Sequence, residues 1–175
     1  MVVAARLPPS AHVLDLGCGE GRNALYLADL GFQTTAIDIS RSGIEKVLTV
    51  ADERGLRVNA SVCDMRDYGF PRPFDLIVCQ GCLHLICRNE WEALLERMKT
   101  KTPNAGFHVV GVFTDTVPEP EDQRGLMVGL FKEGGLLEHY RDWELLDWAS
   151  SVFDHEHPGG IRHKHAANRV TARRP

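Results

Sequence analysis

The sequence has no apolar run long enough to span a membrane, and no basic segment followed by an apolar one opens the chain. The longest apolar stretches, such as residues 107–113, fall far short of the ~20 residues that a membrane helix needs. Five cysteines are an odd number without the spacing of a disulfide framework, so we expect free thiols. These absences favour a soluble, cytoplasmic protein.

The sequence also has little excess charge of either sign, with 20 basic and 24 acidic residues and a net charge of −4. Proteins that bind nucleic acid generally carry a basic surface, so we expect no nucleic-acid partner. A chain of 175 residues suffices for one hydrophobic core and is too short for two. No repeat, linker or low-complexity segment divides the chain, so we expect residues 1–175 to form a single domain.

Short apolar runs alternate with amphipathic helical patterns through the first two thirds of the chain. The predicted strands are residues 12–16, 34–39, 58–63, 74–79 and 107–113. Helices are predicted after the first two strands and over residues 89–99, where Asn89 and Glu92 match a capping box. This order is typical of a mostly parallel sheet covered by helices.

The alternation ends after residue 113. Residues 114–125 are polar and rich in proline, and we predict that they form a lid. A short helix is predicted over residues 134–143. From Glu144 onward the pattern predicts an antiparallel hairpin that turns at Pro158-Gly159-Gly160.

Three glycines lie between the first predicted strand and the helix that follows it. Gly17, Gly19 and Gly21 would let a ligand lie against the backbone at the carboxyl end of that strand. A dinucleotide-binding loop would have its third glycine at position 22, and Arg22 therefore argues against a nicotinamide-dependent oxidoreductase. Asp15, just before the loop, would repel a pyrophosphate but suits a ligand with a cationic ammonium group.

An aspartate also closes each of the next two predicted strands. Asp38 is placed to accept both hydroxyls of a ribose. Asp64 and the backbone N–H of Met65 are placed to bind the exocyclic amine and a ring nitrogen of an adenine. Any one of these aspartates is equally explained as a helix cap or a solvated strand end. Together with Asp15 they describe S-adenosylmethionine, which joins a zwitterion to a ribose and an adenine.

These segments resemble the successive motifs of class I S-adenosylmethionine-dependent methyltransferases, in residues 13–23, 36–38, 63–65, 74–77 and 103–106. Two further segments are similar to the tellurite-resistance methyltransferases: Gly21-Arg22-Asn23 with Leu25-Tyr26-Leu27-Ala28, and Phe131-Lys132-Glu133-Gly134 with Tyr140 and Trp143. The resemblance implies an α/β, Rossmann-like fold, a mostly parallel seven-stranded sheet with an antiparallel C-terminal hairpin and helices on both faces. It also implies methyl transfer to small molecules, including soft chalcogen or metalloid oxyanions and thiols.

The matched motifs imply that the cofactor is S-adenosylmethionine and that no metal is bound. The expected cofactor-binding residues are Asp15, Gly17, Cys18, Gly19, Gly21, Arg22, Asn23, Asp38, Ile39, Asp64, Met65, Cys79 and Gln80. Members of the family usually carry an N-terminal helical segment that covers the cofactor. Few residues precede the first predicted strand here, so we expect a more open site.

Methyl transfer from a sulfonium needs the acceptor to be positioned rather than a covalent catalyst. Candidates for contacting the acceptor are His84, beyond the fourth strand, and His155, Arg162 and His163 in the hairpin. The family's histidine-arginine pair falls on Asp154-His155, and its later arginine is matched by Arg162. An anionic acceptor would need cationic or hydrogen-bonding groups, whereas a protonated thiol would also need a general base.

The histidines of the hairpin depend on its register. A three-residue turn at 158–160 would pair His155 with His163 and Glu156 with Arg162, and would gather His155, His157, His163 and His165 on one face. A two-residue turn would divide them between faces. We favour the first register, in which the histidines form either a solvated, pH-sensitive edge or an acceptor-binding or metal-binding wall.

Two features of the sequence leave alternatives open. Cys79, Cys82 and Cys87 could hold a soft metalloid or metal, but no fourth cysteine follows and a structural role is favoured. The alternative to an enzyme is a cofactor-binding module without catalysis, which a side-chain-filled acceptor pocket would favour.

Overall fold

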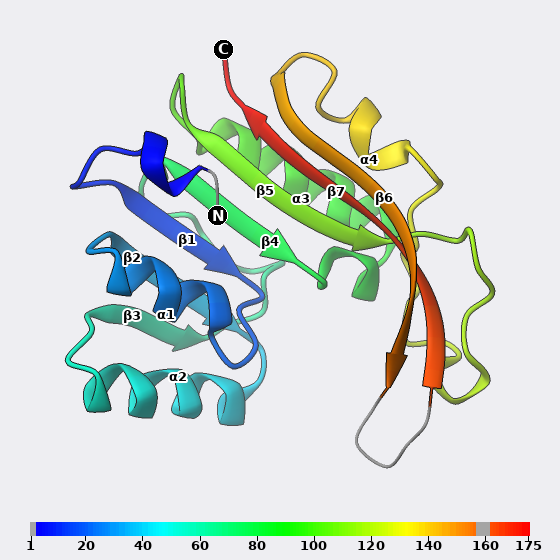
Figure 1. The fold of residues 1–175 in the computed structure, drawn as a ribbon, viewed down its shortest axis with the longest axis horizontal. Coiled ribbons are helices and arrows are strands. Elements are labelled where there is room, and N and C mark those ends of the chain that lie inside the picture. Colours follow the sequence, from blue (N-terminus) through cyan, green and yellow to red (C-terminus); the bar gives the residue numbers. More distant parts are fainter. Residues whose placement is uncertain (1–2, 157–161) are drawn as a thin grey trace.

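The computed structural model describes residues 3–156 and 162–175, apart from the side chains of Asp122, His155, Glu156 and Arg162. The described residues form one seven-stranded sheet in the order β3-β2-β1-β4-β5-β7-β6 (Figure 1). Its strands are β1 (His12–Leu16), β2 (Gln33–Asp38), β3 (Val58–Val62), β4 (Leu76–Gln80), β5 (Phe107–Phe113), β6 (Glu144–Glu156) and β7 (Arg162–Arg173). Strands β1 to β5 are parallel, and β7 runs antiparallel to both β5 and β6. The fold class expected from the sequence is confirmed.

Helices cover both faces of the sheet. The α-helices are α1 (Arg22–Asp29), α2 (Arg41–Glu53), α3 (Arg88–Thr100) and α4 (Gly135–Glu138), and short 3-10 turns are η1 (Ala4–Arg6), η2 (Leu83–Leu85) and η3 (Glu121–Gln123). Alternate residues of β1 enter different clusters: Val13 packs with Leu27 of α1, whereas Leu14 packs in the cluster that contains Trp91 of α3. The period-two alternation of strand side chains therefore separates the two layers of helices, which Figure 1 shows on opposite sides of the sheet.

The predicted helix cap of α3 is wrong by two residues. Asn89 and Glu92 were expected to form a capping box, but α3 begins one residue earlier, at Arg88. A side-chain oxygen of Glu90 accepts the backbone N–H of Cys87 at 2.9 Å, and the Glu90 N–H bonds the Cys87 carbonyl at 3.0 Å. The pairs Cys87–Glu90 and Asn89–Glu92 have the same spacing, so the sequence is compatible with either cap. In the structure the acid of the cap is Glu90, which Arg66 also binds.

The short helix expected over residues 134–143 is confirmed only in part, because α4 ends at Glu138. Beyond it, the Tyr140 hydroxyl lies 2.8 Å from Nδ1 of the buried His108, and Nε2 of His108 lies 2.7 Å from Oγ1 of Thr102. Trp143 packs tilted against the same imidazole, with ring centroids 4.5 Å apart. These tertiary contacts, rather than helix propensity, determine the path of the chain there.

The hairpin has the predicted register. His155 pairs with His163, Glu156 with Arg162, and Asp154 with Lys164. A β-bulge interrupts the pairing between Leu145 and Asp147. The turn itself and His157 lie outside the described residues. Figure 1 shows the far ends of β6 and β7 extending beyond the parallel strands.

No helix of the described residues combines the length and apolar character that crossing a membrane requires.

Candidate active site

The glycine loop (residues 17–21) connects β1 to α1 and is bonded to β2. The backbone N–H groups of Gly17 and Cys18 both donate to one carbonyl oxygen of β2 at 2.9 Å. Gly17 has φ of +72°, and a Cβ atom there would lie 2.6 Å from Sγ of Cys82. Gly21 has φ of +82°, and its Cβ atom would lie 2.4 Å from a side chain of α2. Because only glycine fits at both positions, the loop presents bare backbone at the carboxyl end of β1.

Asp15 is buried beneath this loop, with 1% of its surface exposed. Its Oδ2 accepts the backbone N–H of Ala24 at 2.9 Å, so the carboxyl group holds the first turn of α1. Burial raises the pKa of Asp15 to about 7, against the hydrogen bond from Ala24, which lowers it. The hydrogen bond between Asp15 and Ala24 stabilises the start of α1. The expected contact of Asp15 with an ammonium group of the ligand stays a prediction.

Asp38 joins the end of β2 to the glycine loop. Its Oδ2 accepts the N–H of Gly19 at 2.7 Å, and its Oδ1 accepts the N–H of Ser40 at 2.8 Å. Ser40 in turn caps α2 by accepting the N–H of Gly43 at 3.1 Å, as its position in the sequence predicts. Each oxygen of a carboxylate can accept a second hydrogen bond, so Asp38 retains capacity for a ligand. Beside it, Ile39 leaves 69% of its surface exposed.

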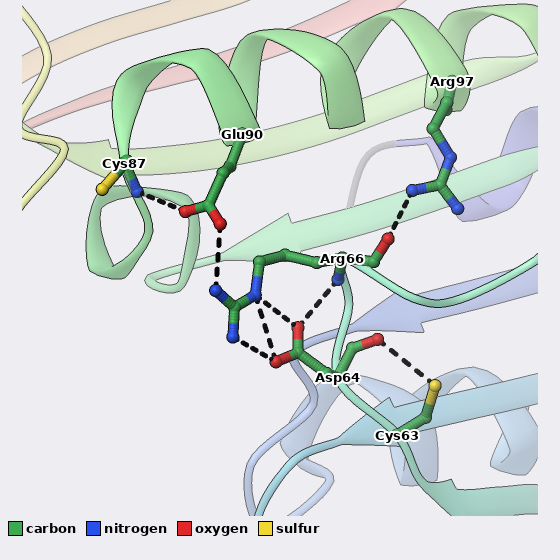
Figure 2. Close-up of polar contacts among 6 residues, drawn as sticks. All are labelled: Cys63, Asp64, Arg66, Cys87, Glu90 and Arg97. Atoms are coloured by element: carbon green, nitrogen blue, oxygen red, sulfur yellow. Dashed lines mark hydrogen bonds and ion pairs between the residues drawn. The ribbon is translucent and has the colours of Figure 1, made fainter.

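Asp64 lies just after β3 and is bonded to Arg66, a residue that no motif of the sequence singles out. The guanidinium of Arg66 donates from Nη2 to Oδ2 of Asp64 at 2.6 Å and from Nε to Oδ1 at 3.0 Å (Figure 2). These bonds hold the pKa of Asp64 below its usual range. Arg66 also reaches Glu90 of α3 at 3.0 Å. Met65 is partly buried against the main core cluster.

The sequence left open that Cys79, Cys82 and Cys87 hold a metal, but among the described residues no group of three or more ligating side chains assembles. Cys79 is fully buried, with its Sγ 3.3 Å from Sγ of Cys82, while Cys87 is exposed at the start of α3. The Cys79 side chain is part of the main core cluster, which agrees with the favoured structural role, and its expected contact with the cofactor stays a prediction. Cys18 is also buried, which raises the pKa of its thiol to about 12.

His84 lies in η2, beyond β4, and is 2% exposed. Its Nδ1 accepts the backbone N–H of Phe113 at 3.1 Å, so the ring proton resides on Nε2. Burial lowers the pKa of His84 to about 4, with a smaller contribution from His165. The ring is therefore neutral at pH 7 and acts as a hydrogen-bond donor from Nε2, not as a cation.

The hairpin histidines within the described residues are buried, so a solvated edge is the wrong interpretation for them. His163 and His165 are 7% and 4% exposed, and their ring centroids are 5.9 Å apart. His165 stacks on Phe113 at 4.6 Å, and Phe113 stacks on His84 at 4.4 Å. Side chains from η2, β5 and β7 thus form one imidazole-aromatic stack, whereas those of His155 and Arg162 lie outside the description.

A cavity of about 780 Å³ lies between the first turns of α1 and strands β4, β5, β6 and β7. Three of the expected cofactor-binding residues line it, namely Arg22, Asn23 and Gln80, and so do Arg6, Tyr26, Val109 and Arg169. Arg169 is paired with Asp147 at 3.1 Å, and within the described part of the chain Arg6 and Arg22 have no ion pair. The cavity therefore suits a ligand that carries negative charge.

The expected lid is a loop whose two ends are fixed. Thr114 bridges to Phe131, and the N–H of Asp115 donates to the Phe131 carbonyl at 2.9 Å. Within the loop, Glu119 accepts the N–H groups of Gly125 and Met127 at 3.2 and 3.1 Å. This geometry agrees with an Ω-loop beside the hairpin, and closure over an acceptor stays a prediction.

The family model described as "Tellurite resistance protein TehB" matches residues 1–170. The chain belongs to the TehB family. The probable S-adenosyl-L-methionine-dependent methyltransferase TehB of Haemophilus influenzae is 30% identical over 154 residues, which are 87% of this chain and 52% of that protein. The recognition of the family from sequence motifs is confirmed.

Solved structures show the same fold. The crystal structure of TehB from Haemophilus influenzae aligns with a TM-score of 0.87 and 28% identity, over 99% of this chain and 61% of that one. The 1,6-didemethyltoxoflavin-N1-methyltransferase of Burkholderia thailandensis, solved with S-adenosylhomocysteine and 1,6-didemethyltoxoflavin, aligns with a TM-score of 0.71 and 25% identity, over 99% and 75% of the two chains. The chain spans about half the length of the curated TehB relatives that it matches.

Proposed function

We propose that this protein transfers the methyl group of S-adenosylmethionine to a small-molecule acceptor. The observation that carries the proposal is the hydrogen bond of 2.7 Å between Asp38 and the N–H of Gly19, which joins a ribose-binding carboxylate to a glycine loop. The names of the TehB relatives, S-adenosyl-L-methionine-dependent methyltransferases, support the same activity.

The residues at the carboxyl edge of the sheet fit the parts of the cofactor. Asp38 accepts the ribose hydroxyls with its remaining lone pairs, and the uncovered side chain of Ile39 provides an apolar surface for the purine. Asp64 and the N–H of Met65 bind the adenine edge. The glycine loop, with Asp15, Arg22, Asn23 and Gln80 near it, holds the amino-acid portion.

When bound, the cofactor supplies an electrophilic methyl group on a sulfonium. The protein has to hold the acceptor in line at about 3 to 3.5 Å from that methyl and to exclude water. His84, neutral and with its proton on Nε2, donates a hydrogen bond to the acceptor, and His163 lies beside the same rings, tilted against His165. His155 and Arg162 stay candidates from the sequence.

We further propose that the acceptor is a soft anion, a chalcogen or metalloid oxyanion or a thiolate. Support comes from the hydrogen-bond donor His84 and from Arg6, which lines the cavity without an ion pair in the described part of the chain. A neutral imidazole with a pKa of about 4 is a poor base, which disfavours a protonated thiol that relies on His84.

The test is a methylation assay across thiols, selenite, tellurite, arsenite and small phenols, combined with calorimetry of S-adenosylhomocysteine. We expect cofactor binding and turnover of at least one soft anion. Binding without turnover of any compound would favour a non-catalytic cofactor-binding module. Turnover of phenols alone would contradict the proposed acceptor class, and no binding would contradict the proposed function itself.

A further inference from the structure

Arg66 connects the segment that follows β3 to the first turn of α3. Its guanidinium donates to Asp64, after β3, and to Oε1 of Glu90, in the first turn of α3, at 3.0 Å (Figure 2). The β3 end carries the expected adenine-binding residues, whereas α3 follows β4 and η2, which carry Gln80 and His84. One side chain therefore ties the segment that carries Asp64 to the first turn of α3.

Helix α3 fixes Arg66 at its backbone as well as at its side chain. Glu90 is itself immobilised, because its Oε2 accepts the N–H of Cys87 at 2.9 Å. Further along the same helix, Nη1 of Arg97 donates to the carbonyl oxygen of Arg66 at 2.6 Å. Nη2 of Arg97 binds the carbonyl oxygen of Tyr68. The Arg97 guanidinium also lies 5.3 Å from the Phe70 ring centroid. The loop that carries Asp64 is thus held at several points by one rigid element.

The hydrogen bonds to Asp64 leave a defined capacity. An ionised carboxylate offers about four acceptor positions. Arg66 supplies three N–H groups to it: its backbone N and Nε to Oδ1 at 2.9 and 3.0 Å, and Nη2 to Oδ2 at 2.6 Å, with Nε shared between both oxygens. Oδ1 thus accepts two donors, whereas Oδ2 accepts one unshared donor and the longer, 3.1 Å contact of the shared Nε, so Oδ2 is the oxygen with room for a further N–H donor.

We propose that Arg66 is a positioning residue for adenine recognition, which orients the Asp64 carboxylate so that its remaining acceptor position binds the 6-amino group of the cofactor. This inference rests on the proposed function, in which Asp64 binds the adenine edge. A carboxylate free to rotate would lose more freedom on binding the amine, whereas one already fixed by Arg66 is preorganised for it.

The alternative is an ordinary surface ion pair, because the Arg66 side chain is 46% exposed and such pairs contribute little to stability. The two roles differ in one measurable quantity. A merely structural Arg66 would change the affinity for every ligand of the site by the same factor. A positioning role changes the contribution of the 6-amino group alone.

The experiment compares S-adenosylhomocysteine with its analogue in which hydrogen replaces the 6-amino group, so that the ring nitrogens are unchanged. Calorimetry on the full chain gives the ratio of the two affinities. We expect the parent to prefer S-adenosylhomocysteine by about ten-fold, as for a hydrogen bond to a charged group. In Arg66→Met the preference should fall to about two- to three-fold.

Two further variants make the result specific. Arg88→Met removes the pair that Arg88 forms with Glu92 at 2.8 Å on the exposed side of the same helix, and it should leave the ten-fold preference unchanged. Glu90→Gln retains an acceptor for the Cys87 N–H but weakens the anchor of Arg66, and it should give an intermediate preference. Thermal unfolding of each variant identifies any that fail to fold.

The outcomes separate the inference from the proposed function. Parent-like preference in both Arg66→Met and Glu90→Gln, or equal affinity of the parent for the two ligands, would overturn the role of Arg66 while leaving cofactor binding intact. No binding of S-adenosylhomocysteine by the parent would overturn both.

Discussion

The glycine-loop region (β1 to β3 with α1 and α2) and the hairpin region (η2, β5, β6 and β7) place their functional groups by different means. In the glycine-loop region, Asp15 and Asp38 are held by backbone N–H groups of Ala24, Gly19 and Ser40. In the hairpin region, the rings of His84 and His165 stack on Phe113, and His84 also accepts the backbone N–H of that residue. In the proposed function, the first arrangement fixes carboxyl groups for a cofactor of constant structure. The second provides a wall of imidazole and aromatic rings that can be replaced to suit an acceptor.

The largest expected effect comes from removing the backbone freedom of the glycine-loop region. Gly17→Ala should abolish measurable S-adenosylhomocysteine binding and destabilise the fold by about 2–4 kcal/mol. The new Cβ atom would lie 2.6 Å from Sγ of Cys82 at a φ of +72°. Urea unfolding and calorimetry measure the two effects.

The matched control is Gly55→Ala, which has φ of +64° but no atom within 4 Å of the added Cβ. It should cost only the backbone strain, about 1–2 kcal/mol, and leave cofactor affinity unchanged. Equal loss of binding in both variants would show that the close contact at Gly17 has no role of its own.

The second prediction concerns the hairpin region. His163→Ala should lower turnover by about ten-fold, the effect of losing one hydrogen bond in the transition state, with unchanged affinity for S-adenosylhomocysteine. Lys164→Ala is the control, since that exposed neighbour lies on the other face of β7. Full turnover in His163→Ala would contradict the proposal that the hairpin histidines contact the acceptor.

The sequence predicted the glycine-loop region better than the hairpin region, for a physical reason. Gly17 and Asp38 follow consecutive parallel strands, whose carboxyl ends lie at one edge of a sheet whatever the details of packing. The alternation of side chains along a strand predicts that His163 and His165 share a face of β7. It does not predict that this face is buried, because the burial depends on Phe113 and η2, which are distant in sequence. Arg66 was missed because its role requires Glu90, and no periodicity links them.

The smallest expected effect is a pH dependence with opposite sign in the two regions. Burial lowers the pKa of His108, in β5, to about 3, while its value in the unfolded chain is near 6.5. Between these values the unfolded state binds the proton and the folded state does not, so stability is lost as pH falls below 6.5. The stability difference between the parent and His108→Gln should shrink by about 1.4 kcal/mol per pH unit, measured by urea unfolding from pH 6.5 to 5.

Asp15→Asn provides the comparison in the glycine-loop region. Burial raises the pKa of Asp15 to about 7, so between pH 4 and 7 the folded state retains a proton that the unfolded state releases. The contribution of Asp15 to stability therefore falls as pH rises, and the difference between parent and variant should have the opposite slope. Parallel unfolding profiles for the parent and both variants would contradict these assignments.

The most direct test of the central claim, that the end of β2 binds the cofactor ribose, is calorimetry of S-adenosylhomocysteine with Asp38→Ala. We predict a loss of affinity greater than ten-fold, because two hydroxyls lose a charged acceptor and Gly19 and Ser40 lose their partner. Asp29→Ala, which removes only an exposed pair with Arg54, should bind like the parent. Unchanged affinity in Asp38→Ala would contradict the account.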